Sequence, residues 1–206
     1  MKNIFPSLQS MAAAFLLIFS VSTVMAGELE IGAQAPAQDL KMKDVNGKEL
    51  ALKDLKSKNG TLVIFSCNTC PFVVAWEGRY NEIADIAAKN GIKMVAVNSN
   101  EAYRDDEDSM EAMREHAKKQ GYKFPYLLDK NSELADAFGA TRTPHVYLFD
   151  KDMKLVYRGA IDNSAKDASA VTAPYLKNAL QNLGAGKEID PNSTKSLGCS
   201  IKRKTT

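Results

Sequence analysis

The sequence predicts an α/β fold in which a central mixed β-sheet carries helices on both faces. The order strand, helix, strand over residues 61–97 predicts a parallel pair joined by a right-handed crossover. Two further strand-like segments, Val146–Phe149 and Leu155–Arg158, flank Lys151-Asp152 and predict an antiparallel hairpin in the same sheet. With 206 residues, 45% of them hydrophobic, the chain can bury one sizeable core.

The elements of the first half follow from periodicity. Gln38–Val45 and Lys48–Leu52 alternate around Asn46-Gly47, which predicts an N-terminal β-hairpin. The continuous apolar run Thr61–Phe65 suits a central strand that is buried on both faces, and Ile92–Val97 suits a second one. Between these strands, apolar residues recur every 3.6 positions over residues 70–89, which predicts one long helix with Pro71 in its first turn.

The second half continues the alternation. The four acids 105–108 precede a helical pattern, Met110–Lys119, and are expected to stabilise its N-terminus. Further segments are a short strand, a short helix and a last helix: Pro125–Leu128, Ser132–Phe138 and Val171–Leu183. A segment punctuated by glycine and proline follows. We therefore expect a domain over residues 27–184 and a linker with a cysteine-containing tail over residues 185–206.

Residues 1–26 are typical of a cleavable signal peptide. Lys2 gives a positive start, residues 11–21 are almost entirely apolar, and Val24-Met25-Ala26 places small residues at a cleavage site. The apolar run is shorter than the roughly 20 residues that a spanning helix needs. The sequence thus predicts a periplasmic or secreted protein without stable membrane insertion after cleavage.

The charge pattern argues against nucleic acid as a partner. Basic residues exceed acidic ones by only 27 to 25, and the charges are spread along the chain. The three cysteines are more informative, because an exported protein meets an oxidising environment in which a close pair can cycle between thiols and a disulfide. Cys67 and Cys70 form such a pair, and Cys199 is left over.

Several motifs together resemble the thioredoxin superfamily, and more closely its peroxiredoxin-like (AhpC/TSA, redoxin) branch. They are a strand leading into the CxxC sequence CNTCP at 67–71, AVNSN at 96–100, FPYLLD at 124–129, GATRTPH at 139–145, KLVYRGAID at 154–162 and GCSIK at 198–202. The resemblance implies a thioredoxin-like fold. It also implies that Pro144 is a cis proline against the cysteines and that Thr143 with Pro144 positions an extended partner chain.

The chemistry of Cys67 and Cys70 can be argued from the residues alone. A disulfide between positions i and i+3 closes a ring too small to stabilise a fold much, so a switch is favoured over a permanent bridge. We expect Cys67, just before the helix, to have a lowered pKa and to attack a partner disulfide. Cys70, one turn into the helix, would then resolve the mixed disulfide.

Two alternatives remain open beside thiol-disulfide exchange. Zinc is not among them, because it would need further ligands from Cys199, His116 and His145, without a second CxxC. A peroxidase would use Cys70 as the peroxidatic cysteine, but the motif threonine, proline and arginine of peroxiredoxins are replaced by Cys67, Val63 and Pro144. Copper binding of the Sco chaperone type would use both cysteines and His145, with a cysteine spacing one residue shorter than in that family.

The sequence therefore predicts an exported thiol-disulfide oxidoreductase with catalytic Cys67 and Cys70, without a bound cofactor or metal. Its expected partners are protein disulfides or dithiols and an upstream electron donor or acceptor. His145 could tune the cysteine pair. Cys199 could be a third redox thiol that bonds to Cys67 or Cys70 when the tail folds back, or a bridge to a second molecule.

Overall fold

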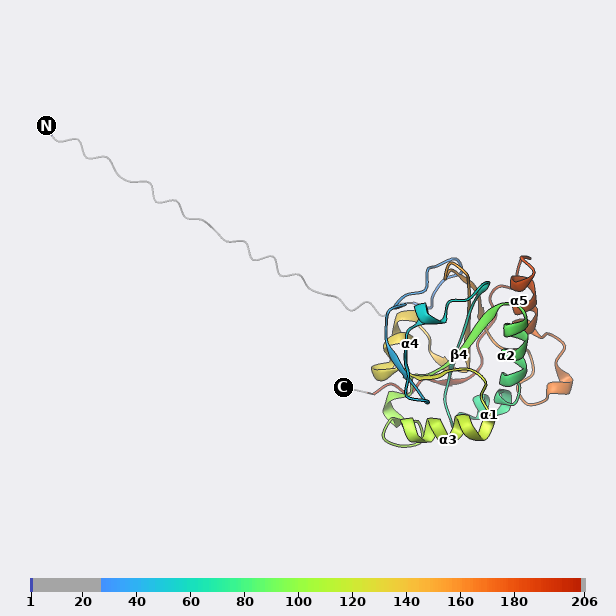
Figure 1. Cartoon of the computed structure of the whole chain (residues 1–206), viewed down its shortest axis with the longest axis horizontal. Coiled ribbons are helices and arrows are strands. Elements are labelled where there is room, and N and C mark those ends of the chain that lie inside the picture. Colours follow the sequence, from blue (N-terminus) through green and yellow to red (C-terminus); the bar gives the residue numbers. More distant parts are fainter. Residues whose placement is uncertain (2–26, 205–206) are drawn as a thin grey trace.

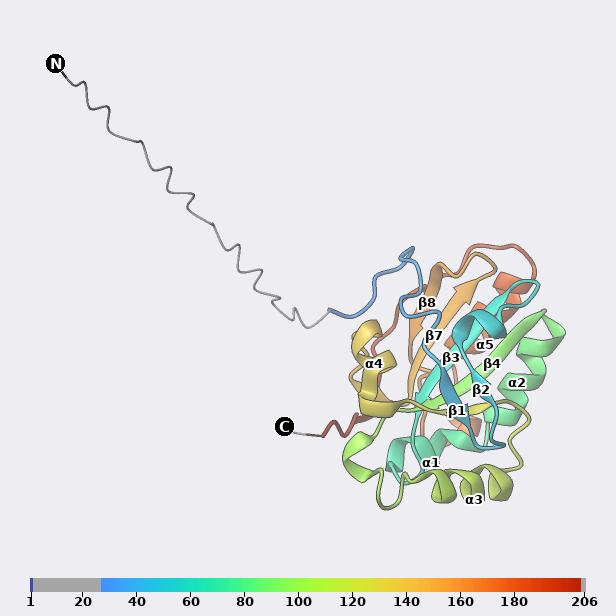
Figure 2. The same ribbon diagram turned by 60° about the vertical axis from the view of Figure 1, so that its left-hand side comes forward.

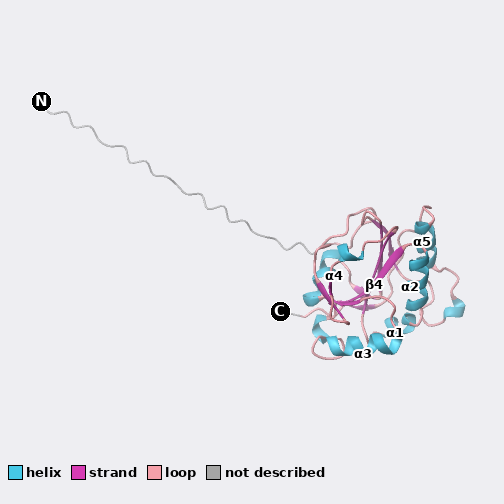
Figure 3. Cartoon of the chain, in the orientation of Figure 1, coloured by secondary structure: helices cyan, strands magenta, loops and turns pink. Residues whose placement is uncertain are grey.

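The computed structural model describes Met1 and residues 27–204, so the predicted signal peptide lies outside the described residues. A seven-stranded mixed sheet forms the central layer, and helices surround it (Figures 1 and 3). The order of the strands is β2-β1-β5-β4-β3-β7-β8. Their bounds are β1 Met42–Asp44, β2 Glu49–Leu50, β3 Gly60–Ser66, β4 Ile92–Asn98, β5 Tyr126–Leu128, β7 His145–Asp150 and β8 Leu155–Gly159.

The predicted pairing of the sheet is confirmed. β3, entirely buried, lies between β4, to which it is parallel, and β7, to which it is antiparallel. β7 and β8 form the predicted antiparallel hairpin. The N-terminal hairpin is also present, but it is shorter than the sequence pattern, because Leu52–Leu55 turns into a 3-10 helix that buries both leucines.

Helices cover both faces of the sheet, as Figure 2 shows with α2 and α5 on one side and α4 on the other. The helices are α1 Pro71–Glu77, α2 Tyr80–Lys89, α3 Met110–Gln120, α4 Glu133–Phe138 and α5 Tyr175–Gly184. One core packs α2, α3 and α5 against the sheet, and a second packs α4 against the opposite face. Trp76 is fully buried in the first core, so it is a packing residue.

The single helix predicted over residues 70–89 is wrong, because α1 ends at Glu77 and α2 begins at Tyr80. Glycine at position 78 weakens helix propensity at the junction. Tertiary contacts hold the two parts apart: Glu77 binds His116 of α3, and Arg79 binds Asp162 and the carbonyls that follow it. The last helix also starts later than predicted, at Tyr175, because Pro174 disfavours helical backbone in the residue before it.

The expected role of the acids 105–108 is also wrong. The N-cap of α3 is Ser109, whose hydroxyl accepts a hydrogen bond from the Ala112 amide. Asp108 is instead completely buried and faces the cysteine loop. Because Ser109 caps α3, the carboxylate of Asp108 can accept hydrogen bonds from other parts of the chain.

The tail packs on the domain rather than extending from it. Cys199–Ser200 forms strand β9, which pairs antiparallel with β6, Arg142–Thr143, in a separate two-stranded sheet. Arg203 then binds Asp136 of α4, beside which the C-terminal segment runs in Figure 2. The division between a domain and a tail at residue 184 stays a prediction. Among the described residues, no helix has the length and apolar character needed to cross a membrane.

Candidate functional site

The cysteine pair lies at the carboxyl end of β3, where the chain turns into α1. Ser66 is the last residue of β3, Cys67 follows it, and α1 begins at Pro71 with Cys70 as its N-cap. The expectation that Cys70 lies one turn into the helix is therefore wrong, because Cys70 is its N-cap. Proline at the first helical position fixes the helix start at residue 71, so the positive end of the helix faces Cys70.

Hydrogen bonds favour ionisation of Cys70 over Cys67. The pKa of Cys70 is lowered by a hydrogen bond from the Cys67 thiol, with further donors in the Cys199 thiol and the amides of Val73 and Cys199, against an opposing effect of burial. The pKa of Cys67 is raised, because its proton is held in the hydrogen bond to Cys70 and because it is buried. These directions favour Cys70 as the thiolate of the reduced pair and Cys67 as its proton donor.

Thr143 contacts the sulfurs of both Cys67 and Cys70. Its hydroxyl oxygen lies 3.4 Å from Cys67 Sγ, and its carbonyl oxygen lies 3.2 Å from Cys70 Sγ, to which it is an acceptor when that thiol is protonated. The Thr143-Pro144 peptide bond is cis, as the resemblance implied. The structure thereby brings together Cys67, Cys70, Thr143 and Pro144, four of the residues that the sequence singled out.

His145 does not join them. Its Nε2 lies 2.9 Å from Glu28 Oε1, and its Nδ1 lies 3.4 Å from the hydroxyl of Tyr147. Both ring nitrogens are engaged away from the sulfurs, so the structure places His145 neither to tune the pair nor to complete a copper site with it. Across residues 27–204, no cluster of three or more His, Cys, Asp or Glu side chains is arranged to hold a metal ion.

A buried polar network supports the loop between the cysteines. The carboxylate of Asp108 accepts hydrogen bonds from the Asn68 amide at 2.9 Å, from Asn98 Nδ2 at 2.7 Å and from Asn100 Nδ2 at 2.8 Å. Tyr126 donates its hydroxyl proton to Asn68 Oδ1 at 2.9 Å. Sequence reasoning missed this network. The asparagines of the AVNSN strand end were a signal for it, because buried amides at a strand end need polar partners.

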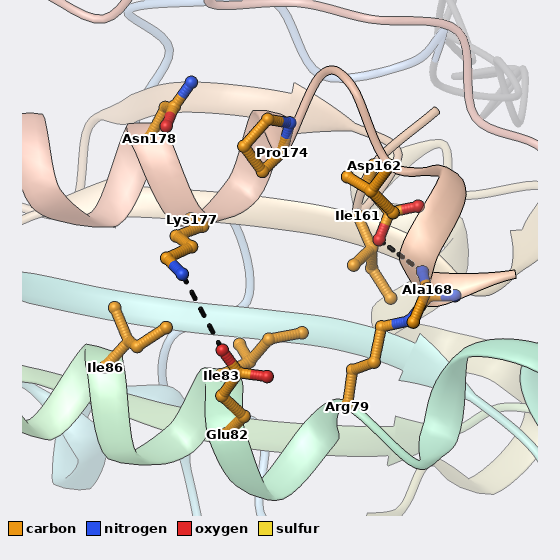
Figure 4. Close-up of a pocket in the computed structure, with 11 residues that line it drawn as sticks. Arg79, Glu82, Ile83, Ile86, Ile161, Asp162, Ala168, Pro174, Lys177 and Asn178 are labelled. Carbon is orange, nitrogen blue, oxygen red and sulfur yellow. Dashed lines mark hydrogen bonds and ion pairs between the residues drawn. The ribbon is translucent and has the colours of Figure 1, made fainter. Parts of the chain in front are cut away.

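The site is small and largely covered. A cavity of about 220 Å³ borders both cysteines and Thr143, with tail residues Cys199, Ser200 and Lys202 on another side. Cys67 is 1% exposed and Cys70 is 6% exposed. A larger cavity of about 350 Å³ lies between α2 and α5, away from the cysteines (Figure 4). There Arg79 binds Asp162 and Lys177 faces Glu82, so these charges already have partners.

The chain shares a sequence pattern with known proteins over much of its length. Residues 31–158 match the AhpC/TSA family. The chain belongs to the AhpC/TSA family. It is an oxidoreductase: among its relatives are the thiol-disulfide oxidoreductases ResA of Bacillus subtilis, 29% identical over 66% of this chain and 71% of that protein, and of Bacillus anthracis, 28% identical over 63% and 69%.

Solved structures share the fold of this chain. An uncharacterized conserved protein from Geobacillus kaustophilus is 37% identical and covers 91% of this AhpC/TSA chain and 100% of its own, with a TM-score of 0.81. Peroxidoxin BcpB from Mycobacterium tuberculosis is 17% identical over 77% of this chain and 98% of its own, with a TM-score of 0.59. The predicted thioredoxin-like α/β fold is confirmed.

The lowered pKa of Cys70 gives a testable pH dependence. An ordinary thiol, with a pKa of about 8.5, loses about tenfold in thiolate for each pH unit below that value. Cys70 has a lower pKa, so it stays ionised as the pH falls through this window. We expect its alkylation by iodoacetamide in the reduced, folded protein, followed by mass spectrometry, to change less than about threefold between pH 8 and 6.

Denatured protein is the control. In it, the rate of alkylation of Cys70 should fall about a hundredfold between pH 8 and 6. In Cys67→Ser, a hydroxyl replaces the thiol that donates a hydrogen bond to Cys70. The pH dependence of alkylation of the folded variant should therefore keep its shape and shift only slightly. A folded profile that follows the denatured one would contradict the assignment of Cys70 as the thiolate.

Proposed function

We propose that this protein exchanges disulfides with partner proteins through the Cys67-Cys70 pair, with Cys70 as the attacking sulfur. The arrangement that carries the proposal is Cys70 at the N-cap of α1, with its sulfur stabilised by thiol and amide donors and Cys67 beside it. The ResA relatives support this reaction type. This proposal reverses the roles that the sequence alone suggested for the two cysteines.

The reaction proceeds in two exchanges. The Cys70 thiolate attacks one sulfur of a partner disulfide, a bond to Cys70 forms, and the second partner sulfur leaves and takes up a proton. Cys67 then loses its proton and attacks Cys70 Sγ, which forms the Cys67-Cys70 disulfide and releases the partner as a dithiol. The same steps run in reverse for an oxidant, and the reduction potentials of the two partners set the direction.

The surface around the pair supports a protein as substrate. Phe72 and Val74 on α1 are 41% and 52% exposed, and Leu197, two residues before Cys199, is 42% exposed. A groove of about 490 Å³ lies beside Phe72, and it is lined by Pro71, Phe72, Ala75, Ser164, Ala165 and Lys166. Exposed apolar side chains around a reactive centre are typical of a protein contact surface. We further propose that Thr143 and Pro144 position the partner.

Parallel assays test the reaction. We expect the protein to catalyse the reduction of insulin disulfides by dithiothreitol, and both Cys70→Ser and the double variant Cys67→Ser, Cys199→Ser to lose that turnover. We expect slow turnover of hydrogen peroxide, because no arginine lines the cavity at Cys70 among the described residues. Fast peroxide turnover that survives Cys67→Ser would establish a peroxidase in place of this proposal.

Phe72 should affect a protein substrate more than a small one. Replacing Phe72 with serine removes exposed apolar area from the contact surface, so we expect KM for insulin to rise about fivefold or more. The rate with a small aromatic disulfide should stay unchanged, because the sulfurs are not altered. Phe72→Leu, which keeps an apolar side chain, is the matched control. Equal losses with both substrates would contradict a docking role.

We also propose that the protein acts outside the cytoplasm. The support is the signal-peptide pattern of residues 1–26. Expression of the full chain followed by fractionation and N-terminal sequencing tests this. The expected mature N-terminus is Gly27, and a full-length chain recovered in the cytoplasm would contradict export.

A further inference from the structure

The tail is built into the cysteine site as an additional strand. In the β6-β9 pair, Cys199 lies opposite Thr143 and Ser200 lies opposite Arg142. Thr143 is the residue whose hydroxyl and carbonyl contact the two sulfurs. The tail strand therefore lies directly along the edge that faces the cysteine pair.

Contacts on both sides hold the tail in this position. Ile201 is 5% exposed in the core under α4, and its amide binds the Thr141 carbonyl at 3.0 Å. The Lys202 amide binds Asn100 Oδ1 at 2.9 Å, and the Lys202 carbonyl accepts from the Ala102 amide at 2.8 Å. Asn100 also binds Asp108, so the tail and the cysteine loop share one polar network.

Gly198 permits the close approach. A Cβ at this position would lie 2.4 Å from the Thr143 carbonyl oxygen and 3.2 Å from Pro144 N. Both are backbone atoms, which cannot move aside as a flexible side chain can. Position 198 therefore requires glycine because there is no space for a side chain where the tail passes Thr143 and Pro144.

This path places a third thiol at Cys70. Cys67, Cys70 and Val73 form a small apolar cluster, against which Cys199 packs. Cys199 and Cys70 also border the same cavity, and the thiol and amide of Cys199 lower the pKa of Cys70. Cys199 is partly exposed, whereas Cys67 and Cys70 are buried. Cys70 thus has one possible disulfide partner inside the protein and a second one that reaches solvent.

We propose that Cys199 is a third redox thiol that takes over the disulfide of the Cys67-Cys70 pair and presents it to an external dithiol reductant. This inference rests on the proposed function, which supplies the oxidised pair. The Cys199 thiol loses its proton and attacks Cys70 Sγ. The Cys70-Cys199 bond forms, the Cys67-Cys70 bond breaks, and Cys67 leaves as a thiolate that takes up a proton. No electrons are gained or lost in this step.

The exchange gives the tail two functions. A partner disulfide reaches Cys70 when the tail moves aside, and the returning tail then moves the disulfide to a partly exposed position. One thiolate of a small or protein dithiol attacks Cys199 Sγ, forms a mixed disulfide and releases Cys70, which takes up a proton. The second thiol of the reductant then attacks its own bonded sulfur, which releases Cys199 as a thiol and leaves the reductant as a disulfide. A tethered thiol acts at a high effective concentration, which lets this transfer compete with reduction of the buried pair.

Disulfide mapping tests the transfer. The reduced protein is oxidised with one equivalent of oxidised dithiothreitol or insulin, quenched in acid, and mapped by peptide mass spectrometry. We expect both Cys67-Cys70 and Cys70-Cys199 disulfides in the wild type, and Cys70-Cys199 in Cys67→Ser. Gly198→Ala should lower the yield of Cys70-Cys199 at least about fivefold by moving the tail away from Thr143.

Gly78→Ala is the matched glycine control, because a Cβ there meets no atom within 4 Å. It should leave the yield of Cys70-Cys199 unchanged. As a second readout, the oxidised Cys199→Ser protein should be reduced by dithiothreitol at least about fivefold more slowly than the wild type. A residue with only a structural role in the tail would not change this rate.

The outcomes separate this inference from the proposed function. Formation of Cys67-Cys70 without Cys70-Cys199 in the wild type, together with no Cys70-Cys199 in Cys67→Ser, overturns the transfer and leaves the exchange reaction in place. Disulfide-linked dimers through Cys199, in place of the Cys70-Cys199 bond, also overturn it. Undiminished insulin reduction by Cys70→Ser overturns the proposed function itself.

Discussion

Cys70→Ser should lose insulin reduction by roughly a thousandfold or more, because it removes the sulfur that forms the first bond to the substrate. Serine has a hydroxyl in place of the thiol, and a hydroxyl does not ionise at neutral pH even beside the same donors. The amides of Val73 and Cys199 and the end of α1 would remain, but no nucleophile would be left for them to stabilise. Initial rates with insulin and dithiothreitol measure the loss.

The roles of the two cysteines separate when the resolving thiols are removed. In the double variant Cys67→Ser, Cys199→Ser, the Cys70 thiolate can still attack a partner, but no internal thiol remains to release it. We expect a stable mixed disulfide between Cys70 and the substrate, visible on non-reducing gels and by mass spectrometry. The matched variant Cys70→Ser, Cys199→Ser keeps Cys67 and should trap little.

The opposite result would restore the roles that the sequence suggested. If the variant that keeps only Cys67 traps the substrate and the variant that keeps only Cys70 does not, then Cys67 is the attacking sulfur. In that case the N-terminus of α1 would stabilise Cys70 as the thiolate that leaves when the Cys67-Cys70 disulfide is opened at Cys67.

Asp108→Asn should destabilise the reduced protein by about 3 kcal/mol, because it leaves buried donors without acceptors. The carboxylate accepts three N–H groups, one of them the backbone amide of Asn68 in the cysteine loop. An asparagine side chain has a single acceptor oxygen, and its NH₂ group would face the remaining donors. Urea unfolding followed by circular dichroism should show a lower midpoint with an unchanged slope.

Asp105→Asn is the control for the change of charge. Asp105 is exposed, in the same run of four acids. The stability of this variant should match that of the wild type. A midpoint of Asp108→Asn equal to that of Asp105→Asn would show that the network does not support the loop. Because Asn100 binds both Asp108 and the tail, the Asp108→Asn protein should also form less of the Cys70-Cys199 disulfide.

The core of the fold follows from local sequence patterns. β3 is a continuous β-branched and apolar run, so the sequence identifies it as a central strand without knowledge of its neighbours. The hairpin of β7 and β8 and the parallel pair of β3 and β4 follow in the same way. The cysteine pair was identified by its motif and by its place between a strand and a helix.

Several features depend on contacts between distant segments, and local patterns do not contain them. The break between α1 and α2 depends on partners of Glu77 and Arg79 from other parts of the chain, Asp162 among them. Asp108 was expected to stabilise the N-terminus of α3, but its carboxylate binds Asn68 in the cysteine loop and Asn98 at the end of β4. His145 follows Pro144 in sequence, but it binds Glu28, which lies 117 positions away.

The sequence by itself determined the α/β fold, the resemblance to its family and the pair of cysteines, because periodicity and motif spacing are local properties. Only the tertiary structure shows which donors surround each sulfur and that Cys199 packs against the pair. The pKa of a thiol depends on the hydrogen-bond donors around it. The donors at Cys70 come from its own helix, from Cys67 and from Cys199 in the tail, 129 residues further along the chain.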